Sequence, residues 1–92
     1  MSAYPTRRIR TALLAKGFRQ DPTHHEMYWL IVEGVKTPVH TYLSHGIREY
    51  GSALLGMMAR ELKLRRSELN ALIECPLSQD DYMQLLARRG TL

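Results

Sequence analysis

The sequence predicts a single α+β domain in which helical segments flank a β-hairpin. Two extended runs rich in aromatic and β-branched residues stand between segments whose apolar residues have helical spacing. A chain of 92 residues suffices for one hydrophobic core and leaves no room for a second. With 45% hydrophobic and 24% charged residues, the composition is that of a folded globular protein. We therefore expect residues 1–92 to form one folding unit.

The first helix is predicted over residues 5–17. Thr6 is the expected N-cap, and Gly17 suits the left-handed residue that follows a helix end. The apolar stripe consists of Ile9, Ala12 and Leu13. Three arginines fall outside this stripe and give the helix a basic outer side; they are Arg7, Arg8 and Arg10.

A hairpin is predicted from residues 25–32 and 35–43, with Glu33 and Gly34 as its turn. Apolar residues occupy both faces of the first strand, so we expect both faces to be covered. Because Pro38 cannot donate a hydrogen bond, the second strand should lie at an edge of the sheet or be irregular there. Residues 18–20 are a candidate third strand.

Three further helices are expected after the hairpin. The first follows Ser44-His45-Gly46 and runs to Leu62, with an apolar face that begins at Ile47 and Tyr50 and includes Met57. Ser67 is the expected cap of the next helix, which Pro76 ends, and Ser78 with Asp81 resembles the capping box of the last. Gly90 should terminate that last helix. The expected core includes Trp29, Leu30, Ile31, Leu54 and Met58.

Composition bears on partners and location. The net charge of +4 and the pI near 9.6 favour polyanionic partners, although a basic surface can also serve solubility alone. Cys75 is the only cysteine, so neither an intramolecular disulfide nor a cysteine-based metal site is expected. The first six residues lack the apolar core of a signal peptide, and no apolar run approaches the roughly 20 residues that cross a bilayer. These observations predict a cytoplasmic protein without a membrane span.

All four histidines fall in or beside the hairpin, and imidazole is the side chain that titrates near neutral pH. They are His24, His25, His40 and His45. On a strand His24 and His25 would point to opposite faces, so at most one of them can line a given site. The same divergence argues against a metal site, and we expect neither a metal nor a cofactor. Packing or simple surface exposure is the alternative for each histidine.

Basic residues supply candidate phosphate contacts. Our predicted RNA-binding set consists of Arg7, Arg8, Arg10, Lys16 and Tyr28. A second basic cluster comprises Lys63, Arg65 and Arg66. Either cluster could instead be an ordinary solvated face.

The motif order resembles that of HicA-like (YcfA-like) toxins of toxin-antitoxin systems. A helix is followed by Gly17-Phe18, by a histidine with tyrosine three positions later (His25 and Tyr28), and by a hairpin. A second histidine then precedes a helix; Thr37-Pro38-Val39-His40 resembles the family's segment, whereas the spacing to Gly51 favours His45. The resemblance covers residues 6–64, and residues 65–92 form a helical extension. Pro22-Thr23 stand where the family usually has a glycine and a small residue.

This resemblance implies a double-stranded-RNA-binding-like fold, with a three-stranded antiparallel sheet packed against helices. It further implies metal-independent cleavage of messenger RNA and a HicB-like antitoxin as protein partner. The spacing to Tyr28 favours His25 as the general base, with His24 and His45 as the other catalytic candidates.

Two other functions remain open. The departure at Pro22-Thr23 is compatible with a branch that binds RNA without cutting it. Residues 58–69 also have the rhythm of a helix-turn-helix, in which residues 67–74 would read DNA. Against DNA binding, this second helix carries Glu68 and Glu74, whereas groove readers usually carry arginine or lysine.

Overall fold

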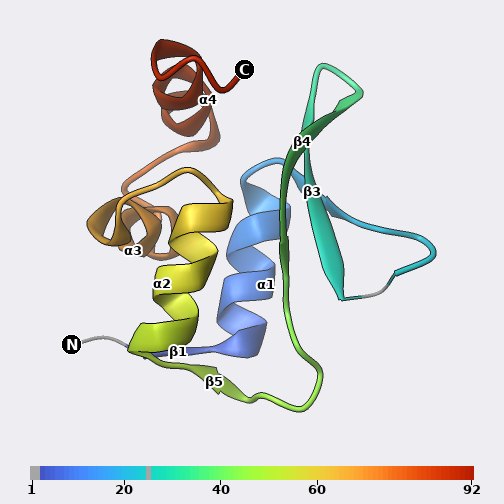
Figure 1. The fold of residues 1–92 in the computed structure, drawn as a ribbon, viewed down its shortest axis with the longest axis vertical. Coiled ribbons are helices and arrows are strands. Elements are labelled where there is room, and N and C mark those ends of the chain that lie inside the picture. Colours follow the sequence, from blue (N-terminus) through green and yellow to red (C-terminus); the bar gives the residue numbers. More distant parts are fainter. Residues whose placement is uncertain (1–2, 25) are drawn as a thin grey trace.

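Four helices lie on one side of an antiparallel sheet in the computed structural model, which describes residues 3–24 and 26–92 (Figure 1). The three-stranded sheet has the order β2-β3-β4, formed by Phe18–Gln20, Met27–Val32 and Val35–Tyr42. A two-stranded sheet pairs β1 (Tyr4–Pro5) with β5 (Glu49–Tyr50). The helices are α1 (Thr6–Ala15), α2 (Ser52–Glu61), α3 (Arg66–Glu74) and α4 (Gln79–Arg88). The predicted α+β class is confirmed, as is the strand at residues 18–20.

Helix α1 begins at Thr6, so the prediction that Thr6 caps this helix is wrong. Pro5 occupies the N-cap position and offers no side-chain hydrogen bond. The Thr6 hydroxyl instead donates to the Ile47 carbonyl at 2.6 Å, and its backbone N–H donates to the Arg48 carbonyl at 2.8 Å. The first turn of the helix is therefore tied to a segment about 40 residues away in sequence.

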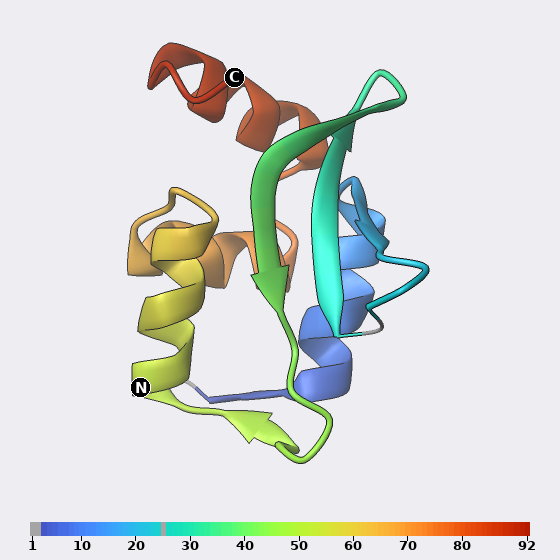
Figure 2. The same ribbon diagram turned by 45° about the vertical axis from the view of Figure 1, so that its right-hand side comes forward.

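The predicted hairpin is confirmed, with a turn in which both Glu33 (φ 52°) and Gly34 (φ 79°) are left-handed. This combination matches the twist of the two strands. Only one face of β3 is covered, so the expectation that both are covered was wrong. Tyr28 and Leu30 are buried under the helices, whereas the side chain of Trp29 on the other face is partly exposed. Figures 1 and 2 show the helices on the inner side of the hairpin only.

Strand β4 contains a bulge at the position where Pro38 predicts an irregularity. Ile31 pairs with Lys36 and Trp29 pairs with His40, so the register shifts between them. The Thr37 hydroxyl donates to the Leu30 carbonyl at 2.9 Å and accepts the Val39 N–H at 3.2 Å. These bonds satisfy backbone groups that the shifted ladder leaves without a strand partner.

The segment before α2 is a loop and a strand, not the start of a helix as predicted. Tyr50 pairs with Tyr4 in the two-stranded sheet, and its buried hydroxyl accepts the Ser44 N–H at 3.0 Å. The helix begins only at Ser52, after Gly51. Met57, expected on the apolar face, has 49% of its surface exposed.

Helices α3 and α4 differ from the prediction mainly at one cap. Arg65, not Ser67, precedes α3, and the Glu68 carboxylate accepts the Arg65 N–H at 2.7 Å. Ser78 caps α4 as predicted, because its hydroxyl accepts the Asp81 N–H at 3.1 Å. Gly90 follows α4 with a φ of 76°.

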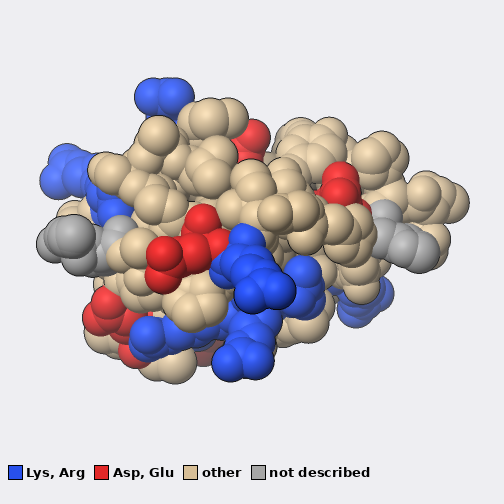
Figure 3. All heavy atoms as spheres, turned by 90° about the horizontal axis from the view of Figure 1, so that it is seen from below, with Lys and Arg blue, Asp and Glu red and all other residues tan. Residues whose placement is uncertain are grey.

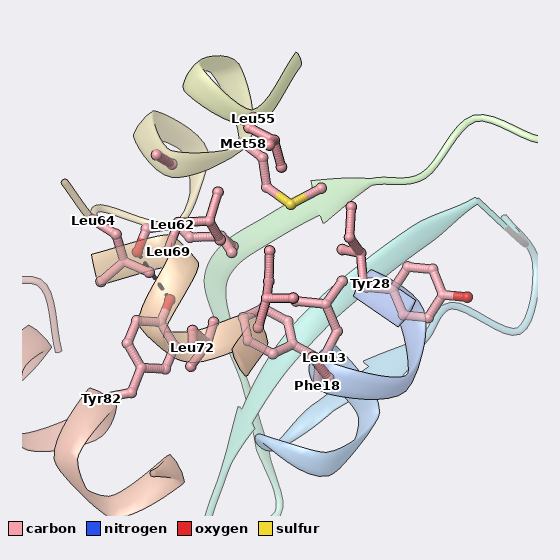
Figure 4. Packing of buried hydrophobic residues seen from close by; sticks show 14 of the residues in the cluster. Leu13, Phe18, Tyr28, Leu55, Met58, Leu62, Leu64, Leu69, Leu72 and Tyr82 are labelled. Atoms are coloured by element: carbon pink, nitrogen blue, oxygen red, sulfur yellow. Dashed lines mark hydrogen bonds between the residues drawn. The ribbon is translucent and has the colours of Figure 1, made fainter. Parts of the chain in front are cut away.

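One continuous core joins all four helices to the sheet (Figure 4). Leu30 and Met58 are buried as predicted, whereas Trp29, Ile31 and Leu54 are only partly buried. The Tyr82 hydroxyl donates to the Leu62 carbonyl at 2.9 Å within this core, and the Tyr82 ring stacks on Phe18. Within residues 3–24 and 26–92, each helix is too short or too polar to cross a membrane.

Candidate nucleic-acid interface

A groove of about 450 Å³ lies beside the first turn of α1. Its charged and polar lining includes Arg7, Arg10, Ser44, His45 and Arg48. The two hydrogen bonds of Thr6 draw the loop of residues 44–48 against the helix, which places Arg48 near Arg7. Figure 3 shows lysine and arginine side chains gathered on this end of the molecule, with acidic side chains beside them. The groove thus offers cations suited to phosphate oxygens.

A second hollow, of about 290 Å³, adjoins this groove through His45, which lines both. Its other lining residues are Thr23, His24 and Glu26. The Glu26 carboxylate accepts the His45 backbone N–H at 3.2 Å and lies 3.8 Å from His45 Nε2. Glu26 therefore ties the His45 loop to the segment just before β3. Two imidazoles and a carboxylate here adjoin the arginine groove.

Of the predicted site residues, the structure brings together Arg7, Arg10, His24 and His45. Tyr28 contributes only its hydroxyl, because 1% of its surface is exposed; this oxygen accepts a hydrogen bond from Arg10 Nε at 3.0 Å. Tyr28 therefore positions Arg10. His25 lies outside the described residues.

Arg8 and Lys16, like Tyr28, do not line the groove. The Arg8 guanidinium lies 5.4 Å from the centre of the Tyr4 ring. Lys16 is buried, with 7% of its surface exposed, and its ammonium donates to the Leu77 carbonyl. The prediction that Lys16 presents its charge to RNA is wrong, because the segment between α3 and α4 covers it.

His40 lies on the outer face of the sheet. Its ring centre is 4.4 Å from that of Trp29, and its Nδ1 is 2.9 Å from the Pro38 carbonyl oxygen.

Arg48 of the groove and Glu26 of the adjoining hollow were not predicted as site residues. Arg48 lies in the segment assigned to a helix; the glycines at 46 and 51 on either side of it were the available signal for a loop. Glu26 precedes β3, and its role depends on the return of the chain at His45.

In the second basic cluster, the Arg66 side chain contacts other parts of the protein, whereas Lys63 and Arg65 are exposed. The Arg66 guanidinium lies 3.3 Å from the Ser52 hydroxyl and 3.4 Å from the Asn70 side-chain oxygen. The Glu68 carboxylate forms a two-bond pair with Arg89, at 2.7 and 3.0 Å, which lowers the pKa of Glu68. Helices α2 and α3 are consecutive, as a helix-turn-helix requires, but α3 offers an acidic and internally bonded surface.

Among the residues that the structure describes, no group of three or more histidine, cysteine, aspartate or glutamate side chains could hold a metal ion. No protein family model matches the chain. Searches of curated proteins and of solved structures likewise find no match.

Proposed function

We propose that this chain binds RNA and cleaves it by metal-independent histidine catalysis, as its resemblance to HicA-like toxins implies. The observation that carries the proposal is the meeting of the two hollows at His45. Phosphate-binding arginines thereby lie on one side of an imidazole, and a second imidazole, that of His24, lies on the other. A double-stranded-RNA-binding-like fold, a cytoplasmic location and a HicB-like antitoxin belong to the same proposal.

The chemistry requires a base, a proton donor and cations. A neutral imidazole accepts the proton of a ribose 2′-hydroxyl, and the 2′-oxygen then bonds to the adjacent phosphorus. The bond from phosphorus to the 5′-oxygen breaks, and this oxygen takes a proton from an imidazolium or from water. The products are a 2′,3′-cyclic phosphate and a 5′-hydroxyl end. Arg7, Arg10 and Arg48 stabilise the charge that develops on the phosphorane oxygens.

His25 keeps its predicted role as the base on the strength of its spacing to Tyr28. His24 and His45, which share a hollow, are the candidates for the proton donor. The carboxylate of Glu26 orients His45 for that role, because it lies 3.8 Å from Nε2 and accepts the His45 backbone N–H.

Cleavage of a single-stranded RNA in excess chelator tests the reaction. We expect His25→Ala to abolish cleavage while RNA binding persists, and His24→Ala or His45→Ala to slow cleavage by about 10²- to 10⁴-fold. Activity should decline below about pH 6, where free imidazole becomes protonated. Sensitivity to chelator would overturn the mechanism. If His25→Ala cuts normally and His45→Ala or His24→Ala does not, the base is misassigned and the reaction class stands.

Salt dependence of binding tests the groove independently of cleavage. Replacing Arg7 and Arg10 by glutamine should reduce the slope of log affinity against log salt by about 1.4, since each single-strand phosphate contact contributes about 0.7. Arg88→Gln, at an exposed position of α4, is the matched control and should leave the slope unchanged. An unchanged slope in the double variant would exclude the groove as the site that binds the RNA backbone. Inert wild-type protein that still binds RNA would indicate a binding module, and tighter binding to duplex DNA would favour the helix-turn-helix.

A further inference from the structure

The outer face of the three-stranded sheet carries a continuous row of rings. Trp29 pairs across the strands with His40, and Met27 pairs with Tyr42. The ring centres of Trp29 and His40 are 4.4 Å apart, and those of His40 and Tyr42 are 5.9 Å apart. The bulge in β4 creates this row, because it moves His40 into register with Trp29. No helix within the described residues 3–24 and 26–92 covers this face (Figure 2).

Each end of the row meets groups that suit a nucleotide chain. At one end the Lys36 ammonium lies 4.4 Å from the centre of the Trp29 ring system. A hollow of about 140 Å³ beside the indole is lined by Lys36 and Arg19 among others. At the other end the His24 ring meets Tyr42 edge-on at 6.2 Å, and His24 also lines the hollow that it shares with His45. The row thus leads from a cationic pocket to the proposed catalytic histidines.

Hydrogen bonds through Asp21 hold the Trp29 ring in place. The indole N–H of Trp29 donates to one Asp21 carboxylate oxygen at 3.0 Å. The other oxygen accepts the backbone N–H and hydroxyl of Thr23, both at 2.8 Å, and the His24 N–H at 3.0 Å. Asp21 is the acidic residue that lines the pocket beside the indole, and its oxygens are committed to these bonds. A pre-ordered ring surface loses little conformational entropy on binding.

We infer that this row is a stacking platform for the unpaired bases of single-stranded RNA. The inference rests on the proposed function and specifies its substrate, because the faces of bases in a duplex are already stacked on one another. One base fits on the indole at the place of the Lys36 ammonium and another against Tyr42, whereas His40 faces Trp29 at 4.4 Å and supports the indole from within the row. The first base takes the place of the Lys36 ammonium on the indole, and that ammonium then pairs with a phosphate. The strand continues past Tyr42 and delivers a ribose and phosphate to His24 and His45.

Fluorescence provides the direct test, since Trp29 is the only tryptophan in the chain. An octauridylate RNA should quench the emission of Trp29 in a saturable titration, and a blunt RNA duplex of equal length should not. Labelled octauridylate should bind Trp29→Leu and Tyr42→Leu about 5- to 150-fold more weakly than the wild type, the range expected for loss of one stacked base. Tyr42→Phe should restore affinity. Val35→Ser is the control, at a position on β4 with 65% of its surface exposed.

The outcomes separate the platform from the groove. Unchanged octauridylate affinity in Tyr42→Leu, or equal quenching by the duplex, would overturn the platform even if the Arg7 and Arg10 variants confirm the groove. Absence of any RNA binding by the wild type would overturn both proposals. Quenching that depends on protein concentration alone would show that a second copy of the chain occupies this face. Tyr42 is 42% exposed, so its variants remain informative if Trp29→Leu fails to fold.

Discussion

The hydroxyl of Tyr82 is a buried polar group whose hydrogen bond to the Leu62 carbonyl joins α4 to the end of α2. Burial raises the pKa of this phenol above its ordinary value of 10.0. We expect Tyr82→Phe to lower the free energy of unfolding by about 1 to 2 kcal/mol at neutral pH, because the Leu62 carbonyl loses its partner. Urea denaturation measures this change.

The pH dependence of the same variant provides a second check. Since the folded state holds the proton more tightly, the contribution of this group to stability is complete below about pH 10 and declines at higher pH. The free energy of unfolding of Tyr82→Phe should therefore fall less steeply than that of the wild type above about pH 10. Parallel curves would mean that the hydroxyl is accessible to water.

Asp21 gives the opposite sign of pH dependence. Hydrogen bonds, chiefly those from Thr23, lower the pKa of its carboxyl from 3.8 to about 2. Its contribution to stability is present above pH 3.8 and declines as the pH falls toward about 2. Asp21→Asn should flatten the acid limb of the unfolding curve and shift the emission of Trp29 at neutral pH. An emission spectrum identical to that of the wild type would show that the carboxylate does not hold the indole.

Single residues also show which parts of the candidate site could be predicted from the sequence and which could not. Arg7 and Arg10 could be predicted to lie outside the apolar stripe, because helical periodicity fixes the direction of their side chains. The same periodicity could not reveal that Leu77 returns over Lys16, since that contact joins residues 61 apart in sequence. Spacing in the sequence likewise could not predict that the His45 backbone bonds to the Glu26 carboxylate.

Among the elements, α2 offers a matched pair of adjacent leucines. Leu55 is fully buried, whereas Leu54 packs against the core with part of its surface exposed. We expect Leu55→Ala to cost about 2 to 5 kcal/mol in unfolding free energy, and Leu54→Ala to cost clearly less, because a partly exposed cavity fills with water. Chemical denaturation of the two variants tests this order. A larger loss of unfolding free energy in Leu54→Ala than in Leu55→Ala would mean that α2 turns a different face toward the core.

Strong local signals made the helices and the hairpin predictable, and long-range pairing made the remainder unpredictable. The Glu33-Gly34 turn and the flanking β-rich runs are local, and the hairpin followed from them. Residues 47 and 50 fit a helical stripe, yet Tyr50 pairs with Tyr4 near the start of the sequence. Tertiary pairing thus overrode a helical pattern that is real in the sequence.

At the scale of the whole molecule, the helical extension is part of the core. Leu69, Leu72, Tyr82 and Leu86 are fully buried in the same cluster as Leu13. We expect a chain that ends at Leu64 to lack a cooperative thermal transition, because it would expose the surfaces that these side chains cover. Calorimetry and circular dichroism measure this. A cooperative transition in the shortened chain would show that residues 6–64 fold alone.

The bulge at Thr37–Val39 also affects how the protein meets copies of itself. Strand β4 forms an open edge of the three-stranded sheet, and a regular edge invites a strand from another molecule to continue the ladder. Here Pro38 has no N–H to donate, and the Val39 N–H already donates to the Thr37 hydroxyl. The opposite edge, β2, is only three residues long. The same distortion that aligns His40 with Trp29 therefore protects the sheet against edge-to-edge aggregation.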